Sequence, residues 1–64
     1  MSAPRPGQVW QRNEDAGFVE ILRVGSHWLT YQPLYARHDD VRYRALSDFG
    51  ACYTYRPNIT REVL

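Results

Sequence analysis

Two histidines, a pair of aspartates and a single cysteine are the residues whose chemistry could support a metal site or a nucleophile. His38, Asp39 and Asp40 are consecutive, whereas His27 and Cys52 stand alone. Consecutive residues in a loop or strand splay apart, so this run is a poor source of three convergent metal ligands. A solvated turn is the simpler interpretation, and we predict neither a metal site nor a cofactor.

Cys52 could act as a nucleophile only with a histidine base, and nothing in the sequence brings His27 or His38 to it. No glycine-rich loop precedes the cysteine to stabilise an oxyanion, and the four glycines are too scattered to form a phosphate-binding loop. A single cysteine also excludes an intrachain disulfide, and a small buried hydrophobe is its simplest role. We therefore predict no catalytic residue and no enzymatic activity.

Aromatic and arginine side chains are the remaining candidates for a binding surface. The chain has two tryptophans, five tyrosines and two phenylalanines, more large rings than a domain of this size can bury. Rings flanked by arginine could stack nucleic-acid bases, the same residue types are enriched at protein contacts, and a third interpretation is structural, with arginines covering the rings. The candidate binding residues are Trp10, Trp28, Tyr35, Arg42, Arg44 and Tyr55.

Length and charge limit these alternatives. A chain of 64 residues forms one domain, and its stability margin of about 3–5 kcal/mol leaves few apolar contacts to spare for a deep enzyme cleft. The formal net charge of +1, from eight basic and seven acidic residues, is not typical of a strong nucleic-acid binder. All the basic residues are arginine, which suits bidentate recognition of phosphate or carboxylate but also follows from codon usage in a GC-rich genome.

The chain shows no signal for a membrane or for secretion. No apolar run approaches the roughly 18 residues of a membrane span, and the first residues, MSAPRPG, lack the apolar core of a signal peptide. We therefore expect a cytoplasmic protein with no membrane partner.

Gly17 to Leu34 is the stretch around which the chain is organised, and it has the pattern of a β-hairpin. Phe18–Val24 and Trp28–Tyr35 are rich in β-branched and aromatic residues, and Gly25-Ser26 supplies the turn. Pro33 cannot donate a ladder hydrogen bond, which predicts an edge or a bulge there.

Shorter strands are expected on both sides of this hairpin, at residues 8–12, 41–45 and 51–56. Leu46–Phe49 is too short for an α-helix and suits a single 3₁₀ turn before the last strand. The clearest alternation is in the 41–45 strand, where Val41 and Tyr43 share one face and Arg42 and Arg44 the other.

We expect the apolar face of that strand to point inward. The expected buried set is Val9, Val19, Ile21, Val24, Leu29, Tyr31, Val41, Tyr43, Leu46, Phe49 and Cys52 or Tyr53. The predicted fold and binding surfaces depend on this parity, that is, on which alternate side chains of the 41–45 strand point inward. If Val41 and Tyr43 faced water while Arg42 and Arg44 were enclosed, the predicted architecture and both binding predictions would lose their basis.

Five short strands with hairpin-like links and one helical turn before the last strand resemble the SH3-like small barrel. The matching features are Gly17, the Gly25-Ser26 turn and the LSDF segment. The resemblance implies an all-β fold, namely a five-stranded SH3-like small barrel with one 3₁₀ turn before the last strand. The barrel would span residues 8–56, with an extended N-terminal arm at residues 1–7 and a C-terminal tail at residues 57–64, and Leu46 and Phe49 would plug its open end.

A narrower resemblance is to short bacterial and phage-borne domains of unknown function. The runs that carry this resemblance are GFVEILRV, then LTYQPL, then VRYRALSDF. Those domains have a glycine-led strand, a V-Y-type third strand and an R-x-L-x-x-F element before their last strand. This resemblance implies a barrel and a bacterial or phage origin, and it supplies no activity.

Two functions are predicted from these observations. The first is a small non-enzymatic binding module for protein–protein interaction, an adaptor or inhibitor, which would use a free strand edge or a groove lined by Trp28, Tyr35 and Tyr55. A homodimer through the strand edge is one form of it. The alternative is a nucleic-acid-binding SH3-like barrel, in which Arg42 and Arg44 project beside aromatic rings. The net charge favours the first function, and the all-arginine usage favours the second.

Overall fold

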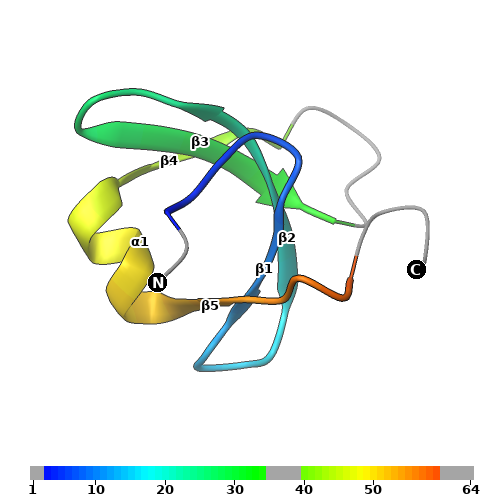
Figure 1. The fold of residues 1–64 in the computed structure, drawn as a ribbon. Coiled ribbons are helices and arrows are strands. Elements are labelled where there is room, and N and C mark those ends of the chain that lie inside the picture. Colours follow the sequence, from blue (N-terminus) through cyan, green and yellow to red (C-terminus); the bar gives the residue numbers. More distant parts are fainter. Residues whose placement is uncertain (1–2, 35–39, 60–64) are drawn as a thin grey trace.

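A computed structural model describes residues 3–34 and 40–59 of the chain, which form one antiparallel sheet and one helix (Figure 1). The elements are β1 (Val9–Arg12), β2 (Phe18–Val24), β3 (Trp28–Pro33), β4 (Arg42–Ala45), α1 (Leu46–Cys52) and β5 (Tyr53–Tyr55). The strands lie in the order β4-β3-β2-β1-β5, so consecutive strands pair as hairpins and β5 returns to pair with β1. The expectation of a mainly β protein with five antiparallel strands is confirmed.

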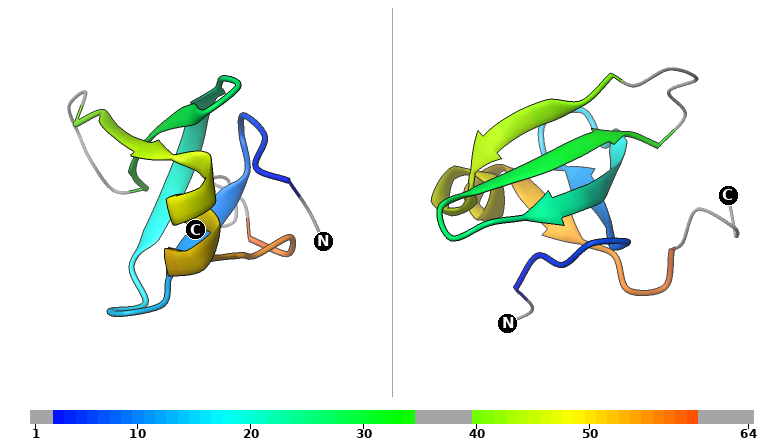
Figure 2. Two further views of the ribbon diagram at one scale, coloured as in Figure 1. Left: turned by 90° about the vertical axis from the view of Figure 1, so that its left-hand side faces the viewer. Right: turned by 90° about the horizontal axis from the view of Figure 1, so that it is seen from above.

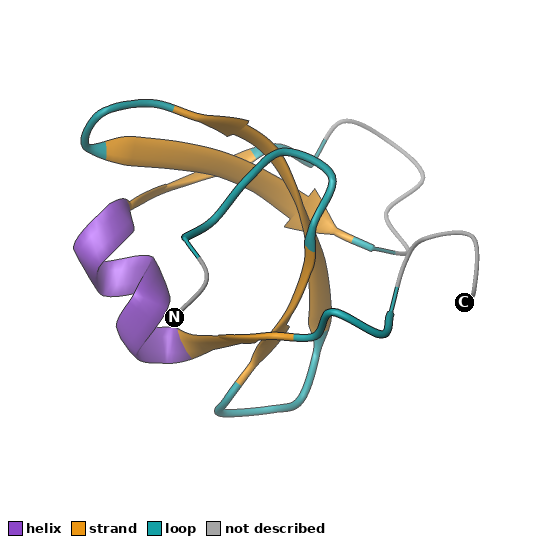
Figure 3. Ribbon diagram, in the orientation of Figure 1, coloured by secondary structure: helices purple, strands orange, loops and turns teal. Residues whose placement is uncertain are grey.

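The sheet is strongly curved, and β2 is where it bends. The register between β2 and β3 shifts between Ile21 and Arg23, which is typical of a β-bulge, and a bulge bends its strand and increases the twist. As a result the sheet curls, and its inner face is concave (Figures 2 and 3). Helix α1 connects β4 to β5 at one end of the curled sheet. The helix has seven residues, and no helix in the described ranges is long and apolar enough to cross a membrane.

A cluster of aromatic rings fills the concave face around Phe49. The Phe49 ring stacks on Tyr53 with 4.3 Å between centroids, and it meets Trp10 at 5.2 Å and Tyr31 at 5.5 Å. Seven of the expected core residues are buried, namely Val9, Val19, Ile21, Leu29, Tyr31, Phe49 and Tyr53. Three more are partly buried against this cluster, namely Val24, Leu46 and Cys52.

Helix α1 corrects the expected 3₁₀ turn at Leu46–Phe49. The segment LSDFGAC forms an α-helix, so Gly50 does not end the element and β5 begins at Tyr53 rather than at Ala51. A helix this short would not form in isolation. It is held by the burial of Phe49, which is 0% exposed, and by the backbone N–H of Tyr53, which donates to the Phe49 carbonyl.

Strand β4 shows that the expected parity was wrong. Tyr43 is 73% exposed and Val41 is 38% exposed, whereas Arg42 and Arg44 lie on the concave side. The register explains the reversal, because Arg44 is opposite Leu29 and Arg42 is opposite Tyr31. Leu29 and Tyr31 are both buried, and directly opposite residues share a face.

The large inward side chains of β3 therefore decide which face of β4 is enclosed. A four-residue strand at the end of the sheet follows its neighbour's register, and its own polar alternation does not override that pairing. Arg44 is half-buried and Arg42 is exposed, and both lie on the opposite face from the exposed rings of Trp28 and Tyr43. The parity of β4 thus no longer supports either binding prediction, and function has to be argued from other features.

Candidate binding surfaces

The predicted binding residues do not gather on one surface. Trp10 is 5% exposed and belongs to the core, and Tyr55 packs on it with 5.4 Å between ring centroids. Trp28 lies on the convex face, on the other side of the sheet from Tyr55, because its neighbour Leu29 points into the core. Because they lie on opposite faces, Trp28 and Tyr55 cannot line one groove together. Tyr35, the third residue of the predicted groove, lies outside the described residues.

An exposed aromatic pair, Trp28 and Tyr43, lies on the convex face at the start of β3 and on β4. Trp28 is opposite Ala45, and Tyr43 is opposite Thr30. Trp28 and Tyr43 are therefore diagonal neighbours on one face, and diagonal residues of an antiparallel pair lie about 7–8 Å apart. Trp28 is 60% exposed and Tyr43 is 73% exposed. Arg23 of β2, also exposed, is opposite Thr30 from the other side, so one cation flanks the pair.

Tyr43 was not among the predicted binding residues, because its alternation with arginine placed it in the core. Alternation shows only that the two faces of a strand differ. Since arginine has an apolar stem that can cover buried rings, the VRYRA pattern fits either orientation. The signal that could have identified Tyr43 is the pairing of β4 with β3, which the sequence alone does not reveal.

The backbone of β4 is free along one side, because this strand ends the sheet in the part of the chain that the structure describes. Leu46 N donates to His27 O at 2.9 Å, and bonded and non-bonded positions alternate along an antiparallel pair. Arg42 and Arg44 therefore direct their backbone groups to β3, while Tyr43 and Ala45 direct theirs away from β3. Ala45 is the N-cap of α1, so its carbonyl accepts the first hydrogen bond of the helix and only its N–H remains at the edge. An unpaired edge of this kind is a template for a further strand.

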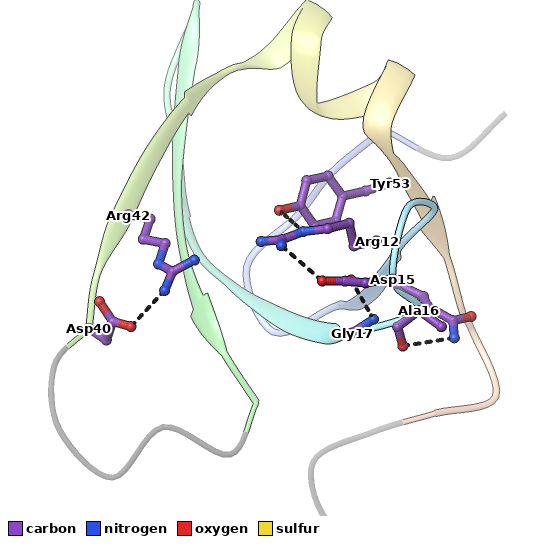
Figure 4. Close-up of polar contacts among 8 residues, drawn as sticks. Arg12, Asp15, Ala16, Gly17, Asp40, Arg42 and Tyr53 are labelled. Carbon is purple, nitrogen blue, oxygen red and sulfur yellow. Dashed lines mark hydrogen bonds and ion pairs between the residues drawn. The ribbon is translucent and has the colours of Figure 1, made fainter.

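The concave face carries arginines that are each paired with a nearby carboxylate. The N–O distances are 3.2, 3.0 and 2.7 Å for Arg12–Asp15, Arg42–Asp40 and Arg44–Asp48, and Figure 4 shows the first two pairs. Glu14 also lines the hollow of about 500 Å³ that Arg12 and Arg44 share. Because carboxylates match or outnumber the guanidinium groups, this hollow is not a strongly positive site for phosphate.

Two buried tyrosines respond to these arginines. Burial alone would raise the pKa of Tyr31, but hydrogen bonds with Arg44 and Tyr53 and the charges of Arg44 and Arg42 outweigh it and lower the pKa. Burial and the hydrogen bond with Tyr31 raise the pKa of Tyr53, although Arg12 Nε donates to its hydroxyl at 3.2 Å. The hydrogen bonds to Tyr31 and then Asp48 raise the pKa of Arg44. The tyrosine hydroxyls and the guanidinium groups therefore mainly form hydrogen bonds with one another.

Two further groups adjoin that network. Arg44 Nε is buried without a hydrogen-bond partner in the described part of the chain. Cys52 is a free, half-buried thiol whose Sγ accepts a hydrogen bond from Arg44 Nη1 at 3.9 Å. Within residues 3–34 and 40–59, no three His, Cys, Asp or Glu side chains come together as a metal site. The His38-Asp39 part of the predicted solvated turn lies outside these ranges.

An apolar hollow of about 650 Å³ lies between the N-terminal arm, α1 and β5, with Pro4, Trp10, Leu46 and Tyr55 among its walls. The Gln8 side chain fixes the arm here, because its Oε1 accepts hydrogen bonds from Arg5 N at 2.9 Å and from Trp10 Nε1 at 3.0 Å. Trp10 is therefore part of the arm's own attachment, which explains why it is nearly inaccessible.

No protein-family model matches the chain, and neither a curated protein nor a solved structure shows significant similarity to it. The surfaces described above therefore have to be interpreted from their own geometry.

Proposed function

We propose that this chain is a non-enzymatic protein-interaction module that binds an extended segment of a partner protein along the free edge of β4. One observation carries the proposal: the exposed pair Trp28 and Tyr43 lies beside the outward-facing backbone groups of the β4 edge, namely the N–H and C=O of Tyr43 and the N–H of Ala45. A strand added at that edge gains affinity from main-chain hydrogen bonds, and it gains specificity from contacts of its alternate side chains. An adaptor or inhibitor of bacterial or phage origin would use a surface of this kind.

The fold we propose for this module is the SH3-like small barrel. The strand order, the bend in β2 and the helix between β4 and β5 support it. The sheet wraps around Phe49, and α1 lies between its two terminal strands, which do not pair with each other. In such a barrel the edge of β4 is left available while the concave face is filled.

The size of the surface predicts weak, reversible binding. Two exposed aromatic side chains offer on the order of 300 Å², and the four residues of β4 add a few main-chain hydrogen bonds. A stable protein interface buries about 800 Å² on each partner. We therefore expect a dissociation constant in the micromolar range or above, unless the partner also contacts neighbouring loops.

The nucleic-acid alternative has lost the observation that motivated it. Arg42 and Arg44 lie on the face opposite Trp28 and Tyr43, and carboxylates accompany them. Among residues 3–34 and 40–59, Arg23 is the arginine opposite Thr30 beside the exposed rings. One cation is a small electrostatic contribution where affinity for nucleic acid depends on several phosphate contacts.

The test is a selection of random peptides displayed on phage against the full chain, followed by an NMR titration of the isotope-labelled chain with the selected peptides. We expect the largest amide shifts at Tyr43 and Ala45, and loss of binding in the Tyr43→Ala variant. Arg5→Ala, an exposed change in the N-terminal arm, is the matched control and should bind normally. Enrichment of no peptide, shifts confined to the Trp10 region, or tighter binding of a single-stranded oligonucleotide would each refute the proposal.

A further inference from the structure

The two faces of β4 present different chemistry to any strand that pairs with it. The convex face offers Tyr43, with Trp28 beside it, and the concave face offers Arg42 and Arg44. Side chains of an added strand alternate between the two faces, and directly opposite residues have Cβ atoms about 4.5–5.5 Å apart. The residues of a partner strand opposite Arg42, Tyr43 and Arg44 therefore meet, in turn, a guanidinium group, an aromatic ring and a second guanidinium group.

Arg42 is the more accessible of the two arginines and retains unused donors. Its side chain is 46% exposed, and its ion pair joins one terminal nitrogen, Nη2, to Asp40 Oδ2 at 3.0 Å. Figure 4 shows both side chains at the mouth of the concave face. A guanidinium group has five N–H donors, and an exposed ion pair of this kind contributes at most about 1 kcal/mol. Arg42 can therefore bind a second carboxylate at little cost in free energy, even if its ion pair with Asp40 is weakened.

Arg44 adds a second, more enclosed cation on the same face. Its side chain is 33% exposed, and Nη1 lies 2.7 Å from Asp48 Oδ2. Its Nε is buried and has no hydrogen-bond partner among residues 3–34 and 40–59. A carboxylate on a neighbouring strand would thus find a cation at two alternate positions of β4.

Other residue types are unfavourable at those positions of a partner strand. A lysine or arginine would place a like charge directly opposite Arg42 or Arg44, which is destabilising, although the neighbouring carboxylates of Asp40 and Asp48 reduce the effect. An apolar side chain would bury part of Arg42 without a compensating contact. The same argument weakens the homodimer form of the prediction, because antiparallel pairing of two β4 strands about Tyr43 places Arg42 opposite Arg44 of the partner subunit.

Resting on the proposed function, we infer that the occupant of the β4 edge is an extended segment in which acidic and apolar residues alternate. Its carboxylates face Arg42 and Arg44, and its apolar side chains face Tyr43 and Trp28. The charges fix the register, since a shift by one residue would place carboxylates on the rings and apolar side chains on the guanidinium groups.

The test uses three synthetic peptides of equal length that share the same apolar residues and carry Glu, Gln or Lys at every second position. We expect the Glu peptide to bind the full chain about tenfold more tightly than the Gln peptide, and the Lys peptide to bind most weakly. Added salt should reduce the differences. The Arg42→Gln variant should reduce the preference for Glu, and Arg42→Glu should transfer it to the Lys peptide. Arg23→Gln, on the convex face, is the matched control and should keep the preference for Glu.

The outcomes separate this inference from the function on which it rests. Equal binding of all three peptides, with amide shifts at Tyr43 and Ala45, would overturn the acidic preference and leave the β4 edge as a binding site. No shift at β4 with any peptide would overturn the inference, and the phage selection decides separately whether the edge binds other sequences. A dimer through β4, seen by sedimentation of the chain alone, would also overturn it. Circular dichroism of each variant establishes that it is folded.

Discussion

The two faces of the sheet use the same kinds of side chain for different purposes. On the concave face the rings of Trp10, Tyr31, Phe49 and Tyr53 contact one another, and all are at most 5% exposed. On the convex face Trp28 and Tyr43 are 60% and 73% exposed. Aromatic content therefore identifies neither the core nor a binding surface, and the position of a ring relative to the curved sheet decides which it is.

Arginine shows the same division. Arg12 and Arg44 on the concave face bond to tyrosines and carboxylates, while Arg23 on the convex face is exposed. A substitution should accordingly affect stability on one face and binding on the other.

Phe49→Ala is the substitution with the largest expected effect. It removes the ring at the centre of the core, which should cost about 3–5 kcal/mol of the free energy of unfolding. That is about the whole margin expected for a domain of this size, so most of the protein should be unfolded, as measured by circular dichroism and urea denaturation. Tyr43→Ala, the same kind of truncation on the convex face, should change stability by less than about 0.5 kcal/mol. An unchanged melting curve for Phe49→Ala would exclude Phe49 from the core.

Tyr53→Phe tests the hydroxyl contacts of the concave face. The change keeps the ring but removes the acceptor of the hydrogen bond from Arg12 Nε, which should destabilise the fold by about 1 kcal/mol. Tyr43→Phe, in which the lost hydroxyl is exposed, is the control and should be neutral. If the two variants have equal urea midpoints, the concave network contributes no stability.

Ionisation of the two buried tyrosines gives a smaller, pH-dependent effect. Tyr31 should ionise before Tyr53, because the pKa of Tyr31 is lowered and that of Tyr53 is raised. Tyr31 thus contributes stability above its unfolded pKa of about 10, which is lost as the pH falls through its lower folded pKa. Tyr53 contributes stability below pH about 10, which is lost as the pH rises through its higher folded pKa.

NMR of ring-labelled tyrosine can measure the order of the two ionisations. Arg44→Gln should raise the pKa of Tyr31, since it removes a hydrogen bond and a positive charge, and Arg23→Gln should not. Ionisation of Tyr53 first would contradict the arrangement of the concave network.

Trp28→Ala should have the smallest effect on stability, within about 0.5 kcal/mol, while it weakens binding of peptides at the β4 edge. Fluorescence anisotropy with a selected peptide measures the binding, and urea denaturation measures the stability. If binding and stability fall together in Trp28→Ala, Trp28 stabilises the fold and does not contact a partner. The distinction between the two faces would then be lost.

The sequence alone determined the strands and most of the core. β-branched and aromatic residues with period-two spacing favour strands wherever they occur, and the tight turn after β2, closed by Gly25 N donating to Trp28 O at 2.8 Å, was predicted from local chemistry. The inward positions of β2 and β3 were predictable because one face of each carries large apolar side chains, as at Ile21 and Leu29.

Only the tertiary structure decided α1 and the orientation of β4. LSDFGAC contains a glycine and is too short to be helical by itself, so its conformation depends on the burial of Phe49 against rings from β1, β3 and β5. Val41 to Ala45 alternates equally well in both orientations, and pairing with β3 selects the one that turns the arginines to the concave side. That selection is non-local, and it placed Tyr43 at the surface, where the proposed binding edge lies.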